Sequence, residues 1–194
     1  MSGPGHNGGP GLDGGQSWRR HCWRAAREAL LPKLPVEVIR TRVRRAGELG
    51  LDYRTYAGVR AQSGHDVIAL LFSTNALRLL RDGDRMAAGD AARLAATCGV
   101  ARLLAAQPPL DPERVSALLA GQGVEIAAAL RAPGIASGWG ETGRLLRGFL
   151  AAERQPAEGV VVIGATELEH DWVVAARLAA FIPARRYFGA AVAG

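Results

Sequence analysis

Cysteine is scarce in this sequence, which contains only Cys22 and Cys98 among its 194 residues. Two cysteines are too few for a disulfide framework, and they cannot supply the ligands of a cysteine-based zinc site. Isolated cysteines usually behave as small apolar residues of a protein core. We therefore expect both side chains to be buried and neither to bind a metal.

Long apolar runs are also lacking. No stretch approaches the roughly 18 to 20 apolar residues that a membrane-spanning helix needs. The first residues are rich in glycine and have no apolar segment typical of a secretory signal. We expect no membrane span and a cytoplasmic location.

Several motifs that identify common enzyme classes are missing. The sequence has no G-x-x-x-x-G-K-[ST] loop, no H-E-x-x-H, no paired cysteine motif and no G-x-S-x-G. A classical nucleotide hydrolase, a zinc enzyme and an α/β-hydrolase are therefore disfavoured. We expect no cofactor and no metal, and we leave open whether the chain is an enzyme.

The composition is that of a folded protein, with 48% hydrophobic and 22% charged residues. Residues 1–16 are an exception, because seven glycines and two prolines favour a flexible tail. We expect residues 17–194 to form a single globular domain with a basic helical segment at 17–62 and an α/β segment at 63–194.

The periodicity of apolar residues predicts a mainly helical α/β fold, with three N-terminal helices followed by a small sheet flanked by helices. Helices are expected at Trp18–Leu31, from Pro35 to Gly50 with a stripe of Val36, Ile39, Val43 and Ala46, and from Asp52 to Ala61. Buried strands are expected at Asp66–Ser73 and Gly159–Gly164. Later helices are expected at 76–81, 88–106, 112–120 and 141–153 and from Thr166 to Phe181, while 124–130 and 186–192 fit either helix or strand.

Positive charge is concentrated near the N-terminus. Residues 17–60 hold 11 basic and 4 acidic side chains, whereas residues 61–194 hold 13 of each. Such a basic segment favours an anionic partner such as nucleic acid. Lys33 is the only lysine among 24 basic residues, so a GC-rich genome is another explanation of the arginine content.

The segment Ala46–Ala61 resembles the helix-turn-helix of phage-repressor-type DNA-binding proteins. Ala46 fits the small residue of the first helix, Gly50 the turn and Leu51 the apolar residue after it, while Leu49 and Val59 fall at positions expected to be buried. The resemblance implies that arginines of this region contact phosphates. The candidate nucleic-acid-binding residues are Arg19, Arg20, Arg24, Arg27, Arg40, Arg44, Arg45, Arg54 and Arg60. An ordinary helical hairpin is the alternative.

The run Trp18–Arg24 places aromatic residues between arginines, a pattern that suits stacking on unpaired bases. The alternative is that both tryptophans belong to the core and the arginines form a solvated face.

The turns that follow the two predicted strands form another candidate site. Thr74, Asn75, Gly164 and Thr166 supply hydroxyls, an amide and a glycine that could hold an anion at the carboxyl ends of strands. These residue types also suit ordinary helix caps. The turns are slightly similar to those of haloacid-dehalogenase-type phosphatases. That family's Asp-x-Asp pair follows a strand, whereas Asp82 and Asp84 follow a helical pattern here, so we do not assign the chain to it.

An acidic cluster follows the second turn: Glu167, Glu169, His170 and Asp171. These groups could bind a metal or exchange protons, or they could simply stabilise the start of a helix in a capping box of Thr166 and Glu169. Taken together, the sequence predicts an accessory protein that binds nucleic acid or another polyanion. The alternatives are a non-catalytic protein that docks on an acidic protein partner and an α/β enzyme that handles a phosphorylated or nucleotide ligand.

Overall fold

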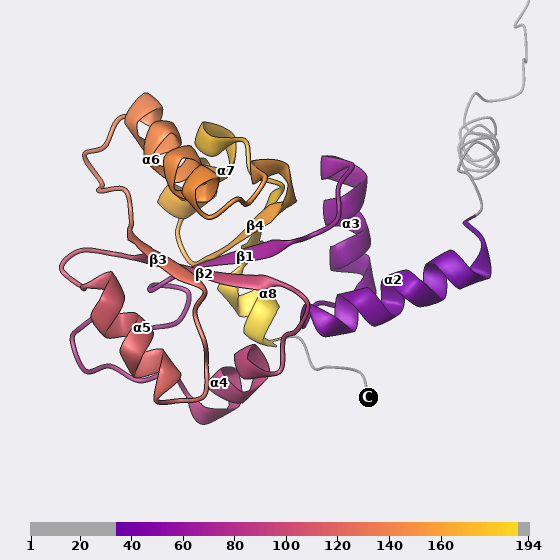
Figure 1. Ribbon diagram of the computed structural model, residues 1–194, viewed down its shortest axis with the longest axis horizontal. Helices are drawn as coiled ribbons and strands as arrows, with labels where there is room; N and C mark the ends of the chain where they lie inside the picture. Colours follow the sequence, from indigo (N-terminus) through magenta and orange to yellow (C-terminus); the bar gives the residue numbers. More distant parts are fainter. Residues whose placement is uncertain (1–33, 190–194) are drawn as a thin grey trace, which may run out of the picture. The chain divides into compact units, whose positions relative to one another are not determined.

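The computed structural model describes residues 34–189. The chain divides into a unit of residues 1–39, of which only 34–39 are described, and a unit of residues 40–194. The second unit contains a five-stranded parallel sheet in the order β3-β2-β1-β4-β5 (Figure 1). Its strands are β1 (Ala69–Ser73), β2 (Ala101–Ala106), β3 (Ala128–Arg131), β4 (Val160–Gly164) and β5 (Ala180–Pro183).

Helices precede the sheet and connect its strands. Within the described range they are α2 (Val36–Glu48), α3 (Tyr53–Ser63), α4 (Ala88–Ala95), α5 (Pro112–Ala120), α6 (Trp139–Ala152), α7 (Glu167–Ala176) and α8 (Ala184–Gly189), with a short 3-10 helix η1 (Ala157–Gly159) before β4. The connections through α4 and α5 extend the sheet from β1 toward β3. The connection through α6 returns to the other side of β1, and the one through α7 leads on to β5, so the two pairs of helices cover opposite faces (Figure 1).

Two apolar clusters fill the space on either side of the sheet, because neighbouring side chains of a strand point to opposite faces. Leu70 and Phe72 of β1 pack in the cluster that also contains residues of α2, α3, α4, α5 and α8. Leu71 of β1 packs in the other, with Leu146 of α6 and Trp172 of α7. Burial on both faces explains why β1 and β4 are continuous apolar runs in the sequence.

The α/β class and the strands predicted at 66–73 and 159–164 are confirmed. The helix predicted at 88–106 is wrong in its second part, where residues 101–106 form β2. The helix predicted from Thr166 to Phe181 is confirmed as far as Ala176 and is wrong only at its end, because β5 begins at Ala180. In both places a residue with a positive φ lies between the helix and the strand. Gly99 has φ +64° before β2, and Arg177 has φ +58° after α7. β3 overlaps the ambiguous segment 124–130, and Tyr187, in the other ambiguous segment, belongs to α8.

Three further expectations need correction. Residues 74–78 form a turn rather than the start of a helix at 76–81, since Arg78 has φ +58°. Cys98 is exposed and not buried. Only Ala46 of the predicted apolar stripe on α2 is buried.

Several sequence predictions concern residues outside the described range. They are the tail 1–16, the helix Trp18–Leu31, Cys22 and the candidate residues Arg19, Arg20, Arg24 and Arg27. Among residues 34–189, no helix is long and apolar enough to cross a membrane.

Candidate functional site

The carboxyl ends of β1 and β4 lie side by side at the point where the strand order reverses. The two strands pair in parallel, with Phe72 opposite Ile163. The predicted turns, residues 73–75 and 164–166, are therefore neighbours. In open α/β sheets this reversal opens a crevice where ligands bind.

A buried carboxylate joins the two turns. Glu169 is fully buried, and its Oε2 accepts hydrogen bonds from the backbone N–H groups of Ala165 at 2.6 Å and Thr166 at 3.0 Å. Its Oε1 accepts from Nδ2 of Asn75 at 2.9 Å and from Nε2 of Gln107 at 3.3 Å. Glu169 therefore occupies the place at the start of α7 where an external anion would otherwise bind. The Thr166–Glu169 capping box predicted from the sequence is confirmed.

The hydroxyl groups beside this carboxylate also form hydrogen bonds within the protein. Oγ of Ser73 accepts from the N–H of Ala76 at 3.0 Å, and Oγ1 of Thr74 accepts from the N–H of Gln107 at 3.0 Å. Gly164 is closely packed, because a Cβ there would lie 2.4 Å from the Phe181 ring. The structure thus brings Thr74, Asn75, Gly164 and Thr166 together, and it uses their polar groups mainly to hold the turns.

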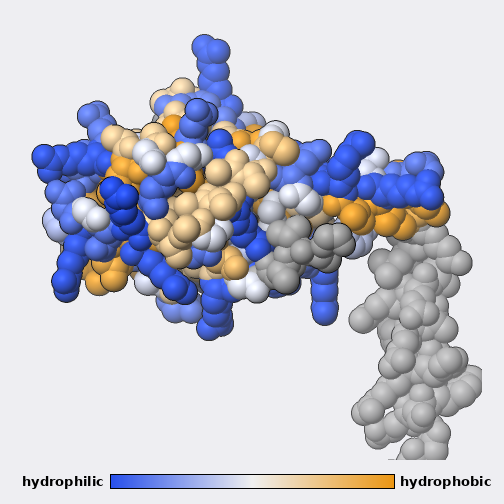
Figure 2. Space-filling view, turned by 90° about the horizontal axis from the view of Figure 1, so that it is seen from below, coloured by the Kyte–Doolittle hydropathy of each residue, from blue (hydrophilic) through white to orange (hydrophobic). Residues whose placement is uncertain are grey.

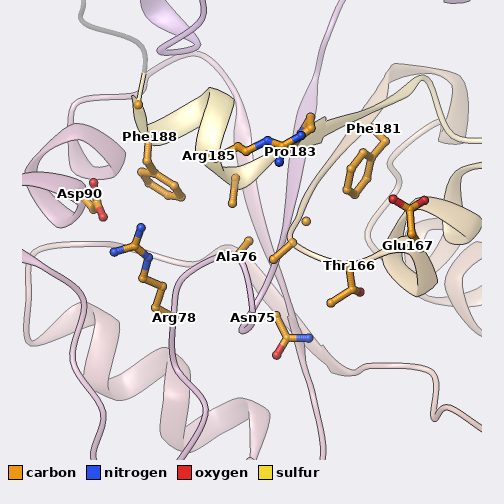
Figure 3. Close-up of a pocket in the computed structure, with 14 residues that line it drawn as sticks. Asn75, Ala76, Arg78, Asp90, Thr166, Glu167, Phe181, Pro183, Arg185 and Phe188 are labelled. Atoms are coloured by element: carbon orange, nitrogen blue, oxygen red, sulfur yellow. The ribbon is translucent and has the colours of Figure 1, made fainter.

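A pocket of about 560 Å³ opens beside the turns. Asn75, Gly164 and Thr166 form part of its wall, and two phenylalanines, Phe181 and Phe188, form apolar sections. Figure 3 shows Phe188 and Phe181 at opposite ends of the space, with Thr166 and Asn75 along one side. A volume of this size accommodates a small organic molecule.

Two arginines, Arg78 and Arg185, line the pocket together with two carboxylates, Asp90 and Glu167. Arg78 comes from the turn after β1 and extends toward Phe188 and Asp90, whereas Arg185 of α8 lies across the opposite side (Figure 3). Within residues 34–189, neither guanidinium has an acidic side chain within 4.0 Å. Sequence reasoning missed both residues. The positive φ of Arg78 is a backbone state that non-glycine residues rarely adopt, and no sequence pattern indicated it.

The predicted acidic cluster is spread over different environments. His170 Nδ1 lies 3.9 Å from Oε2 of Glu167, as expected for residues that share a helix face, while Glu169 is buried and Asp171 is exposed. No group of three or more metal-binding side chains occurs in the described part of the chain.

The α2–α3 pair is joined by a short turn at Gly50, a geometry that fits both the helix-turn-helix resemblance and an ordinary helical hairpin. Ala46, Leu49, Leu51 and Val59 are all buried, and Gly50 has φ +68° in the turn. Asp52 caps α3 by accepting from the N–H and the hydroxyl of Thr55. The Thr55 hydroxyl is the main reason that the pKa of this carboxyl lies below its ordinary value.

Not all candidate arginines of these helices face solvent. Arg45 donates to the carbonyl groups of Val67 and Gly99, both at 2.9 Å, and pairs with Glu48. Arg60 lies 3.6 Å from Asp66. Arg40, Arg44 and Arg54 are exposed.

Comparisons with protein-family models, with curated proteins and with solved structures gave no match to this chain.

Proposed function

We propose that this chain binds a small phosphorylated molecule in the pocket beside β1 and β4. The observation that carries the proposal is the position of Arg78 and Arg185 at the reversal of the strand order, without acidic partners in the described part of the chain. Guanidinium groups pair well with phosphate oxygens. The ligand's phosphate would lie between these arginines rather than at the start of α7.

The same geometry favours binding over chemistry. A nucleophile needs a free hydroxyl or thiol beside a base, and Ser73 and Thr74 are buried in internal hydrogen bonds. Glu169 receives four hydrogen bonds and is turned away from solvent. A binding role therefore accounts for this arrangement best.

Ribose 5-phosphate is a suitable probe, because it carries one phosphate on a small polar body. We expect isothermal titration at low salt to detect binding that Arg78→Gln and Arg185→Gln each weaken about tenfold, the loss typical of one charge-assisted hydrogen bond. Arg144→Gln is the matched control, since Arg144 is exposed on α6. No detectable binding, or equal weakening by all three variants, would refute the proposal.

Nucleic-acid binding through α2 and α3 is the second candidate, and the burial pattern around Gly50 supports it. Arg40, Arg44 and Arg54 would contact phosphates, together with the basic residues that precede residue 34. The exposed residues of α3 are Arg54, Gly58, Ala61 and Gln62. Arg54 and Gln62 are the side chains among them that could read base edges.

An acidic protein partner is the alternative for the same surface. Val36, Ile39 and Val43 are 61%, 37% and 49% exposed on one side of α2. Figure 2 shows apolar side chains along this helix next to hydrophilic ones. A partner surface with acidic and apolar residues would complement both the arginines and the exposed apolar side chains of α2. Co-purification that survives nuclease treatment would favour this partner over nucleic acid.

A further inference from the structure

A second cavity of about 430 Å³ shares two wall residues, Asp90 and Phe188, with the arginine-containing pocket. Its other walls come from α2, α4 and the turn between α2 and α3: Gly47, Gly50, Gly89, Arg93, Ala96 and Thr97. Three of these residues are glycines, and one is alanine. The space is therefore bounded by small side chains, by the Phe188 ring and by Arg93, which donates to the carbonyl of Gly50 at 2.7 Å.

Two of the glycines have no evident structural reason to be glycine. A Cβ added at Gly47 or at Gly89 would meet no atom within 4 Å, and neither residue has a positive φ. Both lie within helices, where glycine is less favourable than alanine. Gly50 differs, since its φ of +68° favours glycine in the turn. Gly47 and Gly89 therefore leave the backbone of α2 and α4 accessible from the cavity.

The residues that line the two cavities differ in chemistry from one cavity to the other. Arg78 and Arg185 supply positive charge on one side of Phe188, Asp90 supplies a carboxylate at the junction, and the glycine-lined cavity is mainly apolar. Figure 3 shows Asp90 and Phe188 next to the end of Arg78. A carboxylate only accepts hydrogen bonds, so it suits sugar hydroxyls, whereas an aromatic ring suits stacking on a flat base.

We propose that the ligand is a mononucleotide whose phosphate lies between Arg78 and Arg185, whose sugar hydroxyls donate to Asp90, and whose base enters the glycine-lined cavity beside Phe188. This inference rests on the proposed function, because it assigns the rest of the ligand to the phosphate site. In a mononucleotide the sugar lies between the phosphate and the base. In the protein, Asp90 lies between the arginines of the first cavity and the apolar second cavity.

The test compares ribose 5-phosphate with AMP, which differs by the base alone. We expect wild-type protein to bind AMP about tenfold more tightly, the gain typical of stacking a base on an aromatic ring. Gly89→Leu and Gly47→Leu fill the cavity from two different helices, and each should bring the affinity for AMP to within about twofold of that for ribose 5-phosphate. Gly148→Leu on α6 is the control, because a Cβ there also meets no atom within 4 Å.

Retained binding of ribose 5-phosphate shows that the leucine variants are folded. Equal wild-type affinity for AMP and ribose 5-phosphate, with both weakened by Arg78→Gln, would overturn the nucleotide assignment and leave the phosphate site standing. An AMP preference unchanged in both leucine variants would also overturn it. If neither compound binds wild-type protein, the proposed function fails as well.

Discussion

Glu169 has a structural role that follows from its surroundings. It is fully buried and receives hydrogen bonds from groups that follow β1, β2 and β4. A buried carboxylate is costly unless donors surround it, and four donors do so here. The side chain therefore ties three strand ends together at the edge of the sheet that carries the pocket.

Replacement of Glu169 by alanine should destabilise the protein strongly. Four donors would lose the buried acceptor they share, so we expect Glu169→Ala to lower the free energy of unfolding by at least about 3 kcal/mol. Urea denaturation followed by circular dichroism measures this change. Glu167→Ala is the control, because Glu167 is exposed in the same helical turn, and its effect should stay below about 1 kcal/mol. Similar losses in both variants would contradict this role.

Asp52 makes part of the stability depend on pH. Its folded-state pKa is below the ordinary value of 3.8, mainly because the Thr55 hydroxyl donates to the charged form. The stabilisation is thus present above about pH 4 and is lost as pH falls through the folded-state pKa. We expect Asp52→Ala to cost about 1 kcal/mol at pH 7, as for other N-cap residues, and less at lower pH. Urea denaturation at pH 7 and pH 3 tests this, and a cost that grows on acidification would be inconsistent with it.

The sequence identified some residues of the site and missed others for a physical reason. Thr166 and Glu169 form a local pattern, with a cap and an acidic residue three positions later, so their pairing was predictable. Arg78 and Arg185 are separated by more than one hundred residues and line the same pocket only because β1, β4 and β5 are neighbours in the sheet. A pattern within a short stretch of sequence does not indicate which distant strands pair.

At the scale of elements, the two missed strands share one cause. β2 has the sequence ARLLAA, and alanine and leucine favour helices when considered alone. β5 is only four residues long and follows α7 without a glycine or proline between them. Their strand conformation depends on pairing with β1 and β4, which are themselves rich in Val, Ile and Leu. Tertiary pairing therefore overrides local preference in both.

The two glycines of the α2–α3 region should respond in opposite ways to alanine. Gly50 has φ +68°, and a Cβ would lie 3.1 Å from the Tyr187 hydroxyl oxygen, so we expect Gly50→Ala to cost about 1–2 kcal/mol. Gly58 lies inside α3 with no atom within 4 Å of a Cβ, so Gly58→Ala should stabilise by about 0.5–1 kcal/mol. Thermal unfolding monitored by circular dichroism compares them. Changes of the same sign would show that the turn is not constrained as described.

At the scale of the whole molecule, the net charge of +6 overstates the charge offered to a partner. Arg44, Arg45 and Arg60 are partly neutralised by Glu48 and Asp66, although Arg44 stays exposed. Arg45 also holds the loops that contain Val67 and Gly99 against α2. The number of arginines in a segment is therefore a poor guide to its affinity for polyanions, and only exposed side chains should affect binding.

This distinction gives the prediction for nucleic-acid binding. A fluorescently labelled 20-base-pair duplex should bind at low salt, and each phosphate contact should add about 0.9 to the slope of log affinity against log salt concentration. The combined Arg40→Gln, Arg44→Gln and Arg54→Gln variant should reduce the slope by about two to three. The matched control combines Arg85→Gln, Arg131→Gln and Arg144→Gln, which remove the same charge from exposed positions of other elements. Fluorescence anisotropy at several salt concentrations measures both slopes. Equal slopes for the two triple variants would mean that overall charge, and not the surface of α2 and α3, attracts the duplex.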